Sequence, residues 1–282
     1  MRSARPGTTQ LTVILVVLAG LSLAAQWPTF PDPTVPRTAD GEPDLDAPAP
    51  RTADGKPDFT GVWQNAWFYD GRVRPLPESP PGAPPPATFG DVFENFTGEL
   101  PLRPWAAELK AARREENSKD NPDAHCLPMG LMQFHMHPQP RKVIQTPNLI
   151  LILYEGNAGI RQIFTDGRSL PDNDPQPWWY GYSVGRWEGD TLVVETSGFR
   201  DDGWLDIEGS PRTDAARMIE RWQRPAYGRV QIDVTIDDPK AYTRPFDVRV
   251  HHRIMLDGLF DAEIIEFICD ENNRAPELMV GK

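Results

Sequence analysis

The sequence predicts a mainly β protein, an antiparallel up-and-down or lipocalin-like barrel with one surface helix and proline-rich excursions. Short apolar runs follow one another after Pro140, and turn residues rather than helices separate them. Consecutive strands joined by short turns are typical of an antiparallel meander. A barrel pairs the two edges of such a meander, which favours it over the alternative, a two-sheet β-sandwich.

The predicted strands are bounded by turns of recognisable chemistry. Glu-Gly-Asn at 155–157 and Glu-Gly-Asp at 188–190 are typical of hairpin turns. Residues 229–236 alternate between polar and apolar side chains, so this strand has one face toward water and one toward a core. Strands are expected at 142–145, 149–154, 159–165, 182–187, 191–196, 218–222, 229–236, 246–254 and 262–269.

A single β-rich domain is expected over residues 59–282, because the composition turns apolar at Phe59. Residues 26–58 are a proline-rich, flexible lead-in, in which RTADGEPDL at Arg37 is repeated as RTADGKPDF at Arg51. A second proline-rich stretch at 71–104 is predicted to be a surface excursion. A helix is predicted at 104–117, where a first-turn proline precedes strong helix formers.

The first 25 residues have the pattern of a secretory signal peptide. Arg2 and Arg5 precede an apolar run at 11–25 that ends in small residues. A membrane span needs about twenty apolar residues, so this run is too short for a stable anchor. We therefore expect cleavage, a periplasmic or secreted protein, and no stable membrane anchor after cleavage.

The charge balance limits the partners. Lys and Arg number 29 against 41 Asp and Glu, which gives a formal net charge of −12 at pH 7. Binding to nucleic acid requires a surplus of cations that neutralise phosphates. The composition therefore excludes a general nucleic-acid binder, and a small molecule is the expected partner. The oligomeric state is left open.

Cys126 and Cys269 are the chain's only cysteines. Because export leads to an oxidising compartment, we expect them to form one disulfide, with two buried free thiols as the alternative.

The histidines predict a metal site. His125, His135 and His137 lie within thirteen residues, and His251 lies on a predicted strand. In an extended segment residues i and i+2 point the same way, so His135 and His137 would present two imidazoles to one copper, zinc or iron ion. His125, His251 or the acid Asp166 would be a third ligand.

Aromatic and basic side chains predict a ligand site. Trp178, Trp179 and Tyr180 stand in a loop that has no strand alternation to bury all three rings. Rings held on a loop at the mouth of a barrel suit a sugar or a planar aromatic ligand. Three arginines on predicted strands would clamp a carboxylate or phosphate inside the barrel, unless they face outward in salt bridges: Arg161, Arg186 and Arg217.

Two carboxylates on apolar strands, Glu195 and Glu220, are candidates for proton transfer. A carboxylate that faces a barrel interior would have a raised pKa and would act as an acid or a base. A one-residue error in strand polarity would move both to the solvent face. Asp166 is the other candidate catalytic acid.

Several motifs together resemble a large, poorly characterised family of secreted proteins of soil bacteria. They include RTADGKPDFTGVW, QTPNLILILYEG, GYSVGRWEGDTLVVETSGF and VTIDDPKAYTRPF, and the resemblance covers nearly all of residues 51–273. It implies a secreted, β-rich domain and leaves the activity open.

Three functional hypotheses follow from these residues. The first is a barrel that binds a small hydrophobic, aromatic or sugar molecule beside Trp178, Trp179 and Tyr180. The second is a metal-dependent hydrolase, lyase or oxygenase that uses the clustered histidines, with Glu195 or Asp166 transferring protons. The third is a structural or interaction module whose proline-rich excursions bind partners. Whether the protein is an enzyme is left open.

Overall fold

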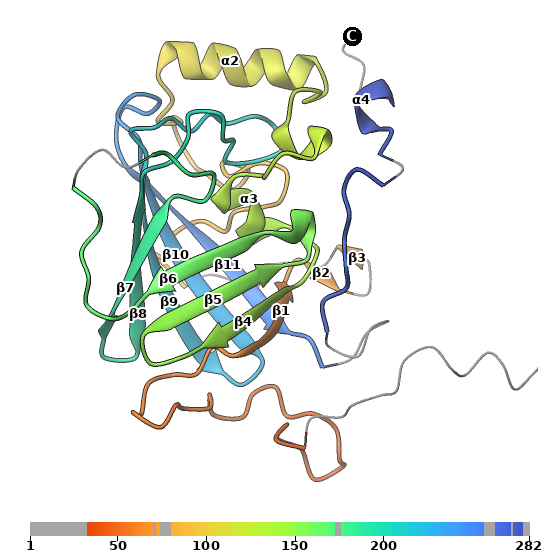
Figure 1. Cartoon of the computed structure of the whole chain (residues 1–282), viewed down its shortest axis with the longest axis vertical. Coiled ribbons are helices and arrows are strands. Elements are labelled where there is room, and N and C mark those ends of the chain that lie inside the picture. The colour runs from red at the N-terminus through yellow and green to blue at the C-terminus, as the bar shows by residue number, and fades with distance from the viewer. Residues whose placement is uncertain are drawn as a thin grey trace, which may run out of the picture.

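A computed structural model describes residues 33–69, 72–73, 80–172, 176–256, 263–271 and 273–278. The predicted signal peptide at 1–25 lies outside them. Among these residues, nine strands close into one barrel, which confirms the predicted fold class (Figure 1). The strands are β1 (Gly61–Asn65), β4 (Arg141–Gln145), β5 (Leu149–Tyr154), β6 (Ile160–Phe164), β7 (Tyr182–Glu188), β8 (Thr191–Ser197), β9 (Arg217–Ala226), β10 (Arg229–Asp237) and β11 (Phe246–Ile254).

The strands from β4 to β11 pair in chain order, and β1 closes the ring between β4 and β11. Every pair is antiparallel except β6 with β7, which run parallel and meet at Ile163 with Ser183 and Phe164 with Val184. A parallel pair needs a long crossover, here residues 165–181. A small ribbon of β2 (Phe68–Tyr69) and β3 (Arg72–Val73) forms a separate sheet.

The alternation predicted for residues 229–236 is confirmed in β10. Val230, Ile232, Val234 and Ile236 are all buried, whereas the residues between them are partly exposed. Burying alternate residues on adjacent strands gives the barrel a continuous apolar lining.

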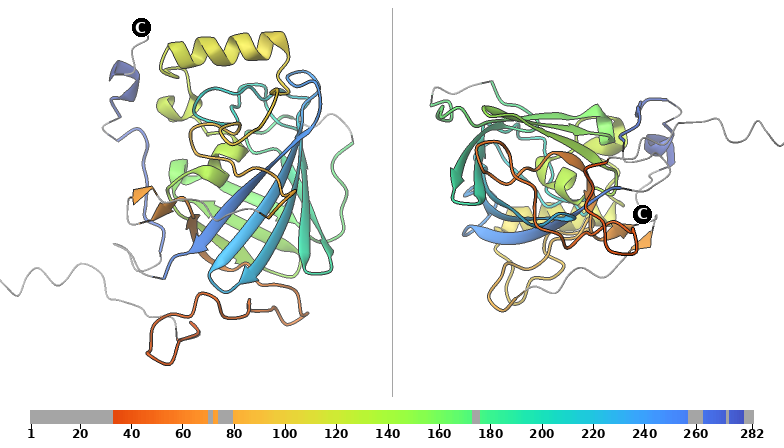
Figure 2. Two further views of the ribbon diagram at one scale, coloured as in Figure 1. Left: turned by 180° about the vertical axis from the view of Figure 1, so that it is seen from behind. Right: turned by 90° about the horizontal axis from the view of Figure 1, so that it is seen from below.

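A short helix, α3 (Leu131–Met136), fills part of the barrel interior, and all six of its side chains are buried (Figure 2). The prediction of an extended segment at His135 was therefore wrong. Six residues are too few to show helical periodicity, and tertiary packing sets this segment instead. Gly130 precedes the helix because a Cβ there would stand 1.9 Å from the carbonyl oxygen of Trp204.

The predicted surface helix is α2 (Pro104–Glu115), which lies across the upper end of the barrel in Figure 1. Its buried Lys110 joins two other segments, because Lys110 Nζ lies 2.6 Å from Asp91 Oδ1 and 3.8 Å from Asp206 Oδ2. The carboxylate of Asp206 also accepts from the backbone N–H groups of Val92 and Ser210.

The repeated motif of the lead-in folds twice into the same turn. Arg37 Nη1 donates to the Gly41 carbonyl at 2.7 Å, and Arg51 Nη1 donates to the Gly55 carbonyl at the same distance. Residues 33–60 run beneath the lower end of the barrel, opposite α2 (Figures 1 and 2). This part of the lead-in is hydrogen-bonded to the β9–β10 turn, where Tyr227 donates to the Ala47 carbonyl.

The predicted disulfide joins Cys126 and Cys269, whose Cα atoms lie 5.4 Å apart. Cys126 follows the 3-10 helix η1 (Pro122–His125), and α4 (Ala275–Leu278) lies near η1 (Figure 1). The strand predicted at 262–269 was wrong, because the described part, 263–269, is irregular. The Ile265 amide donates to a Glu155 side chain instead of a strand partner.

No helix among the described residues is both long enough and apolar enough to cross a membrane.

Candidate functional site

The aromatic loop is fixed to the barrel end by backbone hydrogen bonds. Trp178 N donates to the Gly198 carbonyl at 2.9 Å, and Arg200 N donates to the Trp178 carbonyl at 3.0 Å. Gly181 follows with a φ of +65°, and a Cβ there would stand 2.7 Å from the Ser197 carbonyl oxygen. Only glycine fits this close approach in that conformation. The rings are therefore presented from a fixed backbone.

The three aromatic residues of this loop line one pocket of about 310 Å³, beside the start of β6. Trp178 is 47% exposed and Ile160 is 58% exposed, so two large apolar side chains face solvent here. Such exposed apolar surface in a hollow is typical of ligand sites. The other lining residues are Arg161, Gln162, Pro177, Trp179, Tyr180, Gly181 and Arg200. The structure thus brings four predicted ligand-binding residues together: Arg161, Trp178, Trp179 and Tyr180.

Arg200 supplies the exposed cation of this pocket. Its Cζ lies 4.7 Å from the centroid of the Trp179 ring, within the range of a cation–π contact. Its Nη2 donates to Asp202 at 2.8 Å. Because the guanidinium stacks on Trp179 and Asp202 neutralises its charge, the pocket offers a ligand mainly apolar surface.

Tyr180 connects the pocket to the barrel interior. Its ring packs edge-on against Phe134 of α3, with centroids 5.2 Å apart. Burial raises the pKa of its hydroxyl, so Tyr180 stays protonated and acts as a neutral donor or acceptor.

Arg161 turns its charge into the barrel rather than into the pocket. Nη1 lies 3.1 Å from Oε1 of Glu220 on β9, and Nη2 contacts the other carboxylate oxygen. The hydroxyls of Ser183 and Thr196 accept from the same guanidinium at 3.0–3.2 Å. Of the three arginines predicted to clamp a ligand, Arg161 alone faces the interior, and the carboxylate that it holds belongs to the chain itself, whereas Arg186 and Arg217 form the alternative, outward salt bridges.

Glu220 faces the interior, but its predicted raised pKa was wrong. Burial opposes ionisation, yet the charge of Arg161 and the ring of His135 outweigh it and hold the pKa of Glu220 well below its ordinary value. Burial lowers the pKa of His135 despite the attraction of Glu220. We therefore assign a neutral His135 that donates from Nε2 to Glu220 Oε1 at 2.6 Å.

The backbone carbonyl of His135, at the end of α3, is surrounded by donors from three strands. Asn65 Nδ2, Arg141 Nη1 and His252 Nε2 lie 2.8–3.2 Å from this oxygen. Cationic and polar donors stabilise the negative end of a helix. The interior polar cluster thus holds α3 in place.

The predicted metal ligands are spread over the molecule. His125 Nε2 lies 2.8 Å from the Lys119 carbonyl, whereas the His137 ring packs against Phe89. His251 faces outward from β11, while its neighbour His252 points inward. Across the described ranges, no three or more His, Cys, Asp or Glu side chains are arranged to hold a metal ion.

Glu195 lies on the outer face of β8, so its predicted interior position was wrong. Arg186 Nη1 lies 2.7 Å from Glu195 Oε1, and Arg217 contacts the other oxygen. The bond to Arg217 is the main reason that the pKa of Glu195 is lowered, with Arg186 adding to the effect. The three residues line an outer groove that does not include Trp178, Trp179 or Tyr180. A carboxylate so paired is a poor proton-transfer group at neutral pH.

Asp166 also lies at the surface, where its carboxylate accepts from the Arg168 guanidinium at 2.6–3.0 Å. This bond lowers the pKa of Asp166. As with Glu195, the carboxylate is committed to an arginine of the chain.

Three features of the sequence were missed. Ile160 and Arg200 flank the aromatic loop in space but not in sequence, so no local pattern marks them. Ser183 is the centre of a Gly-Tyr-Ser-Val-Gly sequence, which matches the nucleophile pattern of α/β-hydrolases. That chemistry needs a strand–turn–helix elbow, whereas Ser183 lies within β7 and is bound by Arg161.

A scan against protein-family models, a search of curated proteins and a search of solved structures all gave no match.

Proposed function

We propose that the barrel binds a small molecule that carries an aromatic ring, in the pocket beside the loop of Trp178, Trp179 and Tyr180. The observation that carries the proposal is the joint exposure of Trp178 and Ile160 in one hollow of about 310 Å³. Burying this apolar surface under a flat ring is favourable, and tryptophan offers a stacking face.

Three further observations support the proposal. The backbone of the loop is hydrogen-bonded to residues 198–200, so little conformational freedom is lost when a ligand binds. The guanidiniums of Arg161 and Arg200 are paired with Glu220 and Asp202, so a neutral ring suits the pocket better than an anion. The Cys126–Cys269 disulfide supports a site of action outside the cytoplasm.

The test is binding of 4-fluorophenol, an uncharged aromatic probe, measured by ¹⁹F NMR line broadening. We expect saturable binding to the wild-type protein and about tenfold weaker binding to Trp178→Ala. Leu100→Ala is the control, because Leu100 is an exposed apolar residue (37%) that does not line this pocket.

Equal binding by wild-type protein and Trp178→Ala would overturn the proposal. Cellobiose is titrated in parallel as a sugar probe. Displacement of 4-fluorophenol by low concentrations of cellobiose would replace the aromatic ligand with a carbohydrate at the same site.

A further inference from the structure

Arg212 differs from the other buried arginines of the described chain. Five arginines are buried there, and the other four donate hydrogen bonds to protein acceptors: Arg141, Arg161, Arg224 and Arg249. Arg212 is 2% exposed, and its Nε, Nη1 and Nη2 atoms have no hydrogen-bond partner within the described residues. A guanidinium has five N–H donors, and leaving them unpaired in the interior destabilises the folded state.

Shape rather than hydrogen bonding holds this guanidinium. Its Cζ lies 4.3 Å from the centroid of the Phe199 ring. Gly203 leaves space for it, because a Cβ at that position would stand 1.7 Å from Arg212 Nη2 and 2.4 Å from Cζ. The backbone at Gly203 packs closely against a guanidinium that has no acceptor. This arrangement indicates that Arg212 is held in place to bind a ligand.

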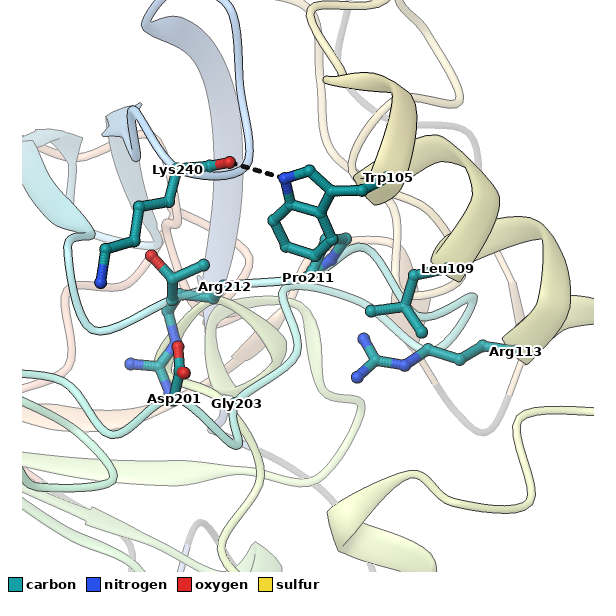
Figure 3. A pocket seen from close by; sticks show the side chains of 9 residues that line it. Trp105, Leu109, Arg113, Asp201, Gly203, Pro211, Arg212 and Lys240 are labelled. Carbon is teal, nitrogen blue, oxygen red and sulfur yellow. Dashed lines mark hydrogen bonds between the residues drawn. The ribbon is translucent and has the colours of Figure 1, made fainter.

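Arg212 is one of the residues that line a pocket of about 460 Å³ between α2 and the loop of residues 199–213, and its three guanidinium nitrogens have almost no solvent-accessible surface (Figure 3). Trp105, Leu109 and Arg113 reach into it from α2, and Lys240 lies at its other side. Trp105 is fixed by a hydrogen bond of 2.8 Å from its Nε1 to the Lys240 carbonyl. Trp105 and Leu109 thus form an apolar wall beside the cation Arg113, and a second cation, Lys240, lies opposite.

The charged neighbours of Arg212 already have partners. Arg113 Nη1 donates to the Gly209 carbonyl at 3.0 Å, and the Lys240 ammonium is paired with Asp214. Asp201, the one carboxylate of the lining, accepts from the Asp214 amide at 3.0 Å. Arg212 is thus the donor left to bind a ligand.

We propose that this pocket binds a small organic carboxylate, with its apolar part against Trp105 and Leu109 and its oxygens on Arg212, whose buried guanidinium shifts toward the pocket to make these bonds. The planar fork of a guanidinium matches a carboxylate through two parallel hydrogen bonds. A bare phosphate would satisfy the same donors but would leave the apolar wall uncovered. The site is separate from the aromatic loop, and the inference does not rest on the function proposed there.

The first test is a ¹⁹F NMR titration with 4-fluorobenzoate at constant ionic strength. The wild-type protein is expected to bind it in a saturable manner. Arg212→Gln is expected to bind about tenfold more weakly, and Arg212→Lys, which keeps the charge but not the fork, is expected to lie between them. Arg229→Gln is the matched control, because Arg229 is an exposed, carboxylate-paired arginine that lines neither this pocket nor the aromatic one.

Gly203→Ala gives a second, independent variant. It leaves every charge in place but moves the guanidinium, so weaker binding of 4-fluorobenzoate is expected here too. This variant and Arg212→Lys decide the question if Arg212→Gln does not fold, as judged by near-ultraviolet circular dichroism.

Three outcomes would overturn the proposal. They are absence of 4-fluorobenzoate binding to the wild-type protein, unchanged binding by the Arg212 variants, and tighter binding of inorganic phosphate than of 4-fluorobenzoate. Trp178→Ala separates this result from the aromatic site, because it should weaken binding of 4-fluorophenol and leave binding of 4-fluorobenzoate unchanged.

Discussion

Arg161 on β6 and Glu220 on β9 form an ion pair across the interior of the barrel, with Arg161 Nη1 3.1 Å from Glu220 Oε1. Strands β7 and β8 lie between them in the sheet, so the pair spans the curved wall rather than adjacent strands. Both side chains are almost fully buried. Removing one partner leaves the other charge uncompensated in a medium of low dielectric.

Glu220→Gln should therefore lower the free energy of unfolding by about 3–5 kcal/mol, measured by urea denaturation. Glu195→Gln is the control, because its arginine partners are half exposed and such pairs contribute about 0–1 kcal/mol. Equal losses in the two variants would contradict the assignment of a buried, stabilising pair.

The stability should decrease as the pH falls from about 6.5 toward 4. Burial, with a smaller effect from a nearby arginine in each case, lowers the pKa of His137 and of His251 from 6.5 to about 4. The unfolded chain then binds protons that the folded chain does not, so stability present above pH 6.5 is lost on acidification. Chemical denaturation at pH 7 and pH 5 measures the change.

His137→Gln is the variant that checks the origin of this pH dependence. It removes one of the groups with a depressed pKa, so the difference in stability between pH 7 and pH 5 should be smaller than in the wild-type protein. An unchanged difference would assign the effect to other groups. Near pH 4 and below, protonation of Glu220 removes further stability, because its pKa is also lowered in the folded state.

Reduction of the Cys126–Cys269 disulfide should destabilise the protein by about 2–5 kcal/mol, because it releases a constraint on the unfolded chain. The bond spans 143 positions and connects the segment around Cys269 to η1. The paired Cys126→Ser and Cys269→Ser variant should show the same loss without reductant. A melting temperature that does not respond to dithiothreitol would be the contrary result.

Gly130→Ala should destabilise the protein by about 3 kcal/mol through overpacking. The added Cβ would stand 1.9 Å from the Trp204 carbonyl oxygen, and backbone on both sides would have to move. Gly90→Ala is the matched control, since a Cβ at Gly90 meets nothing within 4 Å. A small effect at Gly130 would mean that α3 shifts easily within the barrel.

The sequence predicted most strands because their signal is local. Alternation along residues 229–236 and the hairpin turns at 155–157 and 188–190 are properties of neighbouring residues. The helix α3 was missed because its six residues are held by packing from the barrel wall. The segment 263–269 is apolar enough for a strand, but strand formation depends on a free sheet edge, and the closed barrel offers none.

The candidate site was predictable only in part for a related reason. The aromatic loop is contiguous in sequence, so Trp178, Trp179 and Tyr180 were found together. Glu195 was placed on the wrong face, because a slip of one residue exchanges the two faces of a strand. Arg212 carries no sequence signal at all, since its lack of acceptors is a property of the folded surroundings.

The differences between the two copies of the repeated turn determine which copy packs against the barrel. The two copies differ at two positions, Glu42 against Lys56 and, at the last residue, Leu45 against Phe59. Phe59 is buried, with its ring centroid 5.9 Å from that of Trp187 and 5.8 Å from that of Trp222, whereas Leu45 is 37% exposed. If the chain were displaced by fourteen residues, the first copy of the turn would occupy the place of the second. Leu45 would then stand where the ring of Phe59 packs. The benzyl group of Phe59 and the ammonium of Lys56, which lies 5.7 Å from the centroid of the Trp187 ring, therefore distinguish the correct alignment of the lead-in from its duplicate.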